Sequence, residues 1–447
     1  MAEAQLERGL GLAQATALNM IDMVGIGPFV VVPLVIEAMP GPQCLLAWAA
    51  GAVVALMDGC IWAELGAAMP LAGGSYVFLR EAYGPGRWGR FMSFLFIWQT
   101  MFQAPLVMAS ASIGFAQYAS YLVPLGKWEQ KAVSAAVILA VVALLYRRIE
   151  QIGKITLLLW GGVIATLLWL IWTGLSHFEL ARLTSAPPGS WDLSGLFFAG
   201  LGHATVQTMY TYLGYYNVCH LGGEIRAPER NIPRSIFLSI AGVAALYLLM
   251  QTAILGAIPW QDARGSSFIF STLVERIYGA GAARLATVMV LWVAFGSLFA
   301  LTLGYSRVPY AAAADGTFFR VFARVHPTRH FPYVSLAALG AAGLLFSLLF
   351  RLREVIAAIL AMRILVQFIG GAVGVLILRK KWGPERRPFR MWLYPVPAVL
   401  AIALWLAVFF STGRVALAGL GAMAAGTAVF LVRAAAAREW PFAGAAQ

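Results

Sequence analysis

The chain has 447 residues, of which 61% are hydrophobic and 11% are charged. Soluble domains are about 45–50% apolar and about 25% charged, so this composition excludes an ordinary soluble protein and is typical of a helical membrane protein. The net charge of +13 comes from basic clusters between apolar segments, a distribution that indicates membrane topology and not binding of nucleic acid.

Twelve segments are apolar enough and long enough to be membrane spans. We expect them at residues 13–38, 43–68, 91–122, 130–149, 154–176, 193–222, 234–258, 284–312, 334–350, 355–379, 393–411 and 415–433. The dense basic clusters, at 147–148, 226–234, 320–329 and 379–390, all fall on the side of the N-terminus. The positive-inside rule then places residues 1–12 and 434–447 in the cytoplasm, as tails of a multi-pass protein of the cytoplasmic (inner) membrane.

The first span is interrupted near its middle. It reads "MVGIGPFVVVPL" from Met23 to Leu34, and Asp22 stands directly before it. Irregular backbone at this depth is tolerated only where it lines a cavity or is buried in protein. An acid at the bilayer centre costs about 2.5–3.5 kcal/mol on insertion scales. We therefore expect Asp22 to be a counter-charge for a substrate amine or a proton carrier; an acid that caps neighbouring helices is the alternative.

The sixth span carries a similar interruption. It reads "TMYTYLGYYNVCHLGGEIRAPERNIP" over residues 208–233, with Gly214 in mid-membrane. Two broken helices in corresponding positions indicate an inverted-repeat transporter with its substrate site at the breaks. We predict an all-α membrane protein with five-helix repeats at 13–176 and 193–379, followed by two further helices within 393–433. The tyrosines around the break either bind an organic cation through their ring faces or simply pack.

Three more charged residues inside or at the end of predicted spans are candidates for function. Asp58, in "VALMDGCIW", and Glu224, at the end of the sixth span, are candidates for coupling or gating. Glu224 has Arg226, Arg230 and Arg307 as candidate partners; a purely structural role is the alternative. Arg363, in "AILAMRILVQFIGG", either anchors a substrate carboxylate together with Gln367, one turn on, or forms a structural ion pair with Asp22 or Asp58.

The segment at 260–281 is too polar to span a membrane. It mixes Phe268, Phe270, Leu273 and Ile277 with Glu275 and Arg276. This pattern predicts one short amphipathic helix on the outer surface.

Several blocks resemble the amino acid–polyamine–organocation superfamily. They read "GLGLAQATALNMIDMVGIGPFV", "LLAWAAGAVVALMDGCIWAELGAAMPLAGGSYVFLREAYGP", "EIRAPERNIPRSI", "SRVPYAAAADGTF" and "LRKKWGPERRPFRMWLYPVPAV". Together they run from the N-terminus to about residue 400, in the order and spacing of the family. The resemblance implies a leucine-transporter-like fold of twelve helices and secondary transport of amino acids, polyamines or related organocations.

The resemblance also implies site residues. The Gly-Ser-Gly-Ile-Phe motif of the family falls on residues 25–29, where backbone amides would hold an α-carboxylate. Here Ile26 replaces the serine, and Pro28 has no N–H to donate. The aromatic residue that gates the substrate in the sixth span of the family falls on Tyr210. The backbone carbonyl groups of the unwound segment after it would accept hydrogen bonds from the α-amino group of the substrate. The predicted substrate-binding set is Asp22, Met23, Gly25, Ile26, Gly27, Met101, Tyr210, Leu213, Gly214, Tyr215, Leu301, Arg363 and Gln367.

These observations predict a secondary active transporter of amino acids that works by alternating access and is proton-coupled or an exchanger. A polyamine or organocation transporter is the alternative, and a membrane nutrient sensor is a more remote one. We expect a small-molecule substrate, a co-transported proton and the lipid bilayer as partners, and no enzyme activity, cofactor, metal or nucleic acid. Residues 118–131 contain no cysteine, so we expect no disulfide-linked heavy chain.

Overall fold

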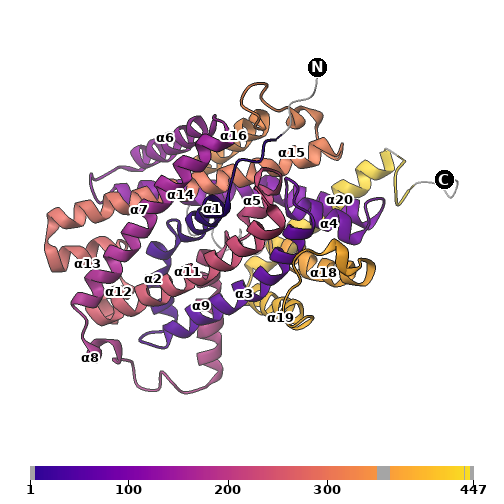
Figure 1. Cartoon of the computed structure of the whole chain (residues 1–447). Coiled ribbons are helices and arrows are strands. Elements are labelled where there is room, and N and C mark those ends of the chain that lie inside the picture. Colours follow the sequence, from indigo (N-terminus) through magenta and orange to yellow (C-terminus); the bar gives the residue numbers. More distant parts are fainter. Residues whose placement is uncertain (1–5, 350–362, 437, 443–447) are drawn as a thin grey trace.

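The computed structural model describes residues 6–349, 363–436 and 438–442. Within these ranges the chain forms helices and no β-strand, apart from two isolated bridges. The helices pack side by side in one bundle (Figure 1). The observed fold is therefore all-α, as the apolar sequence predicts.

Seven helices in the described ranges are long and apolar enough to cross a membrane, and the bent pair at the N-terminus can be an eighth. The seven are α3 (Cys44–Ala68), α5 (Trp88–Ala119), α6 (Lys127–Leu145), α7 (Ile149–Ser176), α11 (Pro228–Ala257), α14 (Ala280–Tyr305) continued by α15 (Arg307–Ala314), and α20 (Val415–Ala436). Each coincides with a span expected from the sequence.

The predicted interruption of the first span is present. Helix α1 (Leu12–Val24) ends at Gly25, and α2 (Gly27–Ala38) begins two residues later with its axis bent by 44°. Gly25 has a φ of +31°, and a Cβ atom there would lie 2.7 Å from the Ser297 hydroxyl. A larger residue would therefore be strained both in its backbone and in its packing.

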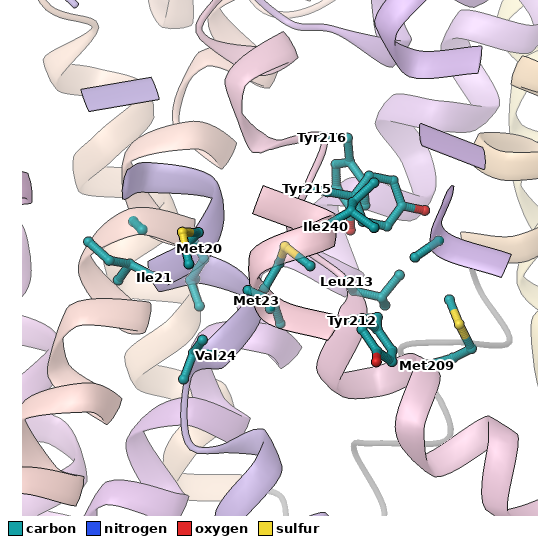
Figure 2. Close-up of a cluster of buried hydrophobic side chains, with 14 of the residues drawn as sticks. Met20, Ile21, Met23, Val24, Met209, Tyr212, Leu213, Tyr215, Tyr216 and Ile240 are labelled. Carbon is teal, nitrogen blue, oxygen red and sulfur yellow. The ribbon is translucent and has the colours of Figure 1, made fainter. Parts of the chain in front are cut away.

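The sixth span is broken as well. Helix α9 (Gly195–Tyr212) gives way to a non-helical turn at residues 213–216, followed by α10 (Asn217–His220) and the 3₁₀ turn η1 (Gly222–Glu224). Gly214 has a φ of +130°, and a Cβ atom there would lie 2.7 Å from the backbone nitrogen of Met23. The two breaks are thus in direct contact. Figure 2 shows Met23 beside Leu213, with Tyr215 and Tyr216 further along the same segment.

Two further predicted spans correspond to the apolar helices α16 (Tyr333–Leu349) and α19 (Val396–Ser411). The described part of α16 matches its predicted span and reaches the edge of the described range. Helix α19 has 16 residues, a length of about 24 Å against a hydrocarbon core of about 30 Å. The tenth span, expected at 355–379, lies partly outside the described residues. Its described part is the π-helical segment η3 (Ile364–Ile369) followed by α18 (Gly370–Lys381). The count of twelve spans stays a prediction.

The segment at 260–281 differs from the prediction of one helix. It forms two short helices, α12 (Trp260–Arg264) and α13 (Ile269–Tyr278), because Gly265 and two serines interrupt the pattern between them. The amphipathic character is observed in α13, which buries Ile269, Phe270, Ser271, Leu273 and Val274. The other short elements are α4 (Ser75–Tyr83), α8 (Leu180–Leu183), η2 (Arg320–Ala323) and η4 (Pro384–Arg386).

Candidate functional site

A cavity lies where the two broken helices meet. It has a volume of about 50 Å³, room for about three to five water molecules. Helices α1, α2, α5, α9 and α14, the turn after α9 and the segment before η3 supply its lining, which consists of Asp22, Met23, Gly25, Ile26, Gly27, Val107, Ser110, Ala111, Tyr210, Thr211, Leu213, Gly214, Tyr216, Ser297, Leu301, Tyr305 and Arg363.

Most of the substrate-binding residues predicted from the sequence line this one cavity, and Met101, Tyr215 and Gln367 do not. Met101 precedes Ser110 by nine residues, which is two and a half helical turns, so the two side chains leave α5 on opposite sides. Gln367 is buried in the π-helical segment η3 and is not among the residues that line the cavity. Tyr215 points toward Asp58 instead.

The sequence prediction missed several lining residues. Val107, Ser110 and Ala111 come from α5, and Ser297 and Tyr305 come from α14. Ser110 hydrogen-bonds the Tyr210 hydroxyl at 3.1 Å. These helices are apolar on most sides, so the sequence alone gives no sign of which face meets the cavity.

Asp22 brings a negative charge to the cavity. It lies in the last turn of α1, where the helix dipole is already negative. Among the described residues no donor lies within hydrogen-bonding distance of its carboxylate, and no cation pairs with it. An unpaired carboxylate at this depth attracts a cation or a proton.

Arg363 brings a positive charge to the same cavity and is 2% exposed. Its Nη1 atom donates to the hydroxyl of Tyr216, and its guanidinium lies over the rings of Tyr216 and Tyr305, at 5.6 and 5.3 Å from their centroids. Its Nε and Nη2 atoms have no partner in the described part of the chain. The ion pair with Asp22 or Asp58 that the sequence left open is not formed in this structure.

Asp58 is fully buried on α3, next to the second break. Its Oδ2 atom accepts hydrogen bonds from the Tyr215 hydroxyl at 2.6 Å and from the Trp62 indole at 2.7 Å. The carboxylate therefore joins α3 to the non-helical turn after α9.

Glu224, at the end of η1, forms a buried ion pair with Arg307. Its two carboxylate oxygens accept from Nη2 and Nε of Arg307 at 2.7 and 2.8 Å, and both side chains are at most 1% exposed. The partner is thus Arg307, and not Arg226 or Arg230. The Glu224 carbonyl also accepts from the amides of Gly9 and Leu10, both at 3.0 Å, so the N-terminal segment is fastened to the same point.

Aromatic rings pack between helices on another part of the bundle. Phe29 of α2 stacks on Phe270 of α13, with centroids 6.2 Å apart, and Trp169 of α7 packs edge-on against Phe270. The Tyr118 hydroxyl of α5 donates to the Phe29 carbonyl at 3.4 Å. These contacts tie α2 to α5, α7 and α13.

Two further observations concern groups away from the cavity. Glu64 accepts from the Arg379 guanidinium at 2.5 and 2.7 Å and from the Met391 amide at 2.7 Å, so it ties α3 to α18 and to the segment before α19. No cluster of histidine, cysteine or acidic side chains in the described ranges could hold a metal ion.

Comparison with known proteins gives a consistent result. The sequence profile of the family described as "Amino acid permease" matches residues 10–430. The serine/threonine exchanger SteT of Bacillus subtilis is 26% identical over 414 residues, or 89% of each chain. The branched-chain amino acid permease BcaP of the same organism is 24% identical over 435 residues, or 92% of this chain and 90% of the relative.

A mammalian relative extends the comparison. Cationic amino acid transporter 4 of Mus musculus is 26% identical over 407 residues, which cover 86% of this chain and 62% of that protein. The names of all three relatives describe transport proteins, and the matches cover 86–92% of this chain. The chain is a multi-pass membrane protein that belongs to the amino acid permease family, within the amino acid–polyamine–organocation superfamily.

Proposed function

We propose that this protein is a secondary active transporter that carries amino acids across the cytoplasmic membrane by alternating access. The observation that carries the proposal is the cavity at the junction of two broken helices, in a chain of the amino acid permease family. Broken helices at mid-membrane place backbone N–H and C=O groups, and the ends of helix dipoles, beside a small solute. The named functions of SteT and BcaP favour the same class of substrate.

The proposed architecture is leucine-transporter-like. It has twelve spans, with five-helix repeats at 13–176 and 193–379 and two further helices within 393–433, and both termini are cytoplasmic. The bent first span and the broken sixth span support this arrangement, because they stand five spans apart in the chain.

The substrate would lie between α1, α2 and the turn after α9. Asp22 would face its ammonium group, and the carbonyl groups of Leu213 and Gly214 would add hydrogen bonds to it. The N-terminus of α2 at Gly27 would contribute backbone amides and a positive dipole end toward its carboxylate.

Alternating access would open one cover of the cavity at a time. We propose that the Glu224–Arg307 pair is the cover on the cytoplasmic side and the Phe29–Phe270 stack the cover on the other side; both contacts are formed in this structure. We propose that the first, second, sixth and seventh spans rock against the rest, so that the ion pair separates when the cavity opens to the cytoplasm. Substrate binding biases this equilibrium only through a difference in affinity between the states.

A polyamine is disfavoured by the cavity itself. A polycation would place several positive charges beside the buried Arg363 guanidinium, and among the described residues of the lining Asp22 is the one acid. An amino acid brings a carboxylate and an ammonium group together, which matches one cation and one anion.

Uptake by purified protein in liposomes tests the proposal. Labelled amino acids should enter protein-containing vesicles faster than protein-free vesicles, and unlabelled substrate on the inside should accelerate exchange. Absence of uptake and exchange for every α-amino acid, in protein that elutes as a single species, would refute the transport function.

Asp58 is the residue we propose for proton coupling. Asp58→Asn should lose accumulation driven by a proton gradient by about tenfold or more while keeping exchange, because the amide cannot carry the proton yet still accepts from Tyr215. Tyr215→Phe is the matched control that removes the hydrogen bond and keeps the carboxylate. If Asp58→Asn lost gradient-driven accumulation and exchange to the same extent, the role of Asp58 would be structural alone.

A further inference from the structure

Arg363 is a buried cation whose hydrogen-bonding capacity is only partly used. It lines the cavity at 2% exposure, and its Nη1 atom is engaged by the Tyr216 hydroxyl. The Nε and Nη2 atoms, which form one edge of the planar guanidinium, have no partner in the described ranges. This edge is the one that binds a carboxylate through two parallel hydrogen bonds.

The aromatic rings around Arg363 hold that edge in place. Tyr216 and Tyr305 each lie against the guanidinium within 6 Å, and both also line the cavity. Cation–π contacts stabilise the charge without using its N–H donors. The guanidinium is therefore positioned by its neighbours and left with two donors for an incoming acceptor.

Asp22 is the complementary group at the same cavity. Its carboxylate has no hydrogen-bond donor among the described residues, and it lies at the negative end of the α1 dipole. Together Asp22 and Arg363 make the cavity neutral overall, with a negative and a positive side chain that do not pair with each other. A ligand that carries both charges would satisfy both groups at once.

We infer that the cavity selects a small, net-neutral amino acid whose carboxylate is bound side-on by Nε and Nη2 of Arg363 and whose ammonium group contacts Asp22. Arg363 is then a specificity-determining residue of the site. The backbone around the first break is poorly equipped for this task alone, because Pro28 has no N–H to donate. This inference rests on the proposed function, because it assigns the substrate of the same cavity.

The size and lining of the cavity limit the side chain of the substrate. A volume of about 50 Å³ admits few atoms beyond the two charged groups. Val107, Ala111 and Leu301 supply an apolar wall, and Ser110 supplies one hydroxyl. We therefore expect alanine, serine or threonine to bind, and amino acids with a third charge or a large aromatic ring to bind more weakly.

The test compares ligands that differ by one charge, using calorimetric titration of the purified full-length protein. L-alanine is compared with L-alaninamide, which lacks the carboxylate, and with propionate, which lacks the ammonium group. L-alanine should bind at least about tenfold more tightly than either analogue, because each analogue leaves one buried charge without its hydrogen bonds. L-glutamate and putrescine should bind more weakly than L-alanine.

Variants of Arg363 test whether this residue causes the preference for L-alanine over L-alaninamide. Arg363→Gln should bind L-alanine at least about tenfold more weakly than wild type and should no longer distinguish it from L-alaninamide. Arg363→Lys should recover part of the preference, because it keeps the charge but lacks the two-donor edge. Arg414→Gln, at an exposed position between α19 and α20, is the control and should bind as wild type does.

The outcomes separate this inference from the proposed function. Wild-type protein that binds alaninamide as tightly as alanine, or Arg363→Gln protein that binds alanine with wild-type affinity, would overturn the role of Arg363 while leaving transport intact. Wild-type protein that neither binds nor moves any amino acid would overturn the proposed function itself. If Arg363→Gln does not elute as a single folded species, the wild-type ligand series and Arg363→Lys decide the question.

Discussion

The polar side-chain atoms of Glu224 and Arg307 all have hydrogen-bond partners. Among the described residues, the carboxylate of Asp22 and two nitrogen atoms of Arg363 have none. All three nitrogen atoms of the Arg307 guanidinium donate, to Glu224, to the Leu303 carbonyl and to the Ser306 hydroxyl. In the cavity, by contrast, two guanidinium nitrogens of Arg363 have no partner among the described residues. Arg363 is as deeply buried as Arg307, and completeness of pairing separates the two guanidinium groups.

The difference is informative because an unpaired buried charge is costly. A fully paired set is complete without any ligand, so it suits a gate or a structural tie, as does the Glu64–Arg379 pair. An incomplete set inside a cavity is completed by a ligand. The predictions below test this comparison.

The largest effect is expected at the paired region. Glu224→Gln removes the counter-charge of the buried Arg307 and should lower the free energy of unfolding by about 3–5 kcal/mol. Thermal unfolding of the purified protein measures the change. The double variant Glu224→Gln with Arg307→Met should recover most of the loss, and a single variant as stable as wild type would contradict the comparison.

A smaller effect, on transport and not on stability, is expected at Asp22. Asp22→Asn should lower uptake by about 10–150-fold, because a hydrogen bond to a charged group contributes about 1.5–3 kcal/mol. Its unfolding temperature should not fall, since the wild-type carboxylate has no partner to lose. Liposome uptake and thermal unfolding are measured on the same preparation, and unchanged uptake would remove the assigned role.

The contact between the two breaks should be sensitive to a single methyl group. Gly214→Ala places a Cβ atom close to the Met23 backbone at a φ of +130°, which should cost about 1–3 kcal/mol. Uptake should fall with it. Gly421→Ala, in α20 with open space around it, is the matched control and should be neutral or stabilising by up to about 1 kcal/mol.

The smallest effect is expected at an exposed ion pair. Arg276 donates to Asp262 at 2.9 Å, and each side chain is about half exposed. Arg276→Ala should change stability by less than about 1 kcal/mol, since solvent screens such pairs, and should leave uptake unchanged. If Arg276→Ala lowered the free energy of unfolding as much as Glu224→Gln, burial would not determine how much an ion pair contributes to the stability of this protein.

The breaks were predictable from the sequence because their cause is local. Gly25 and Pro28 interrupt one apolar run and Gly214 interrupts another, because glycine adopts positive φ and proline lacks an N–H and suits the first turn of a helix. Residues adjacent to these breaks, such as Asp22 and Tyr210, line the cavity in the structure. The presence of two broken helices in one apolar chain supplied the expectation that the breaks form one site.

The faces of the other helices were harder to predict. Met101 is the predicted residue on α5, but Ser110 and Val107 line the cavity from that helix, and the predicted Gln367 is buried in the π-helical segment outside the cavity lining. In a membrane protein the lipid-facing and core-facing sides are both apolar, so hydrophobic periodicity does not reveal which side of a helix turns inward.

The sequence by itself determined the all-helical class, the family and the positions of both breaks, because these depend on composition and on residues close together in the chain. Only the tertiary structure decided which charges are paired. The sequence offered three arginines as ion-pair partners of Glu224, and the structure shows that the partner is Arg307. It offered two acids as partners of Arg363, and neither forms an ion pair with it in the structure. Pairing depends on distances between helices far apart in sequence, and these distances are set by packing.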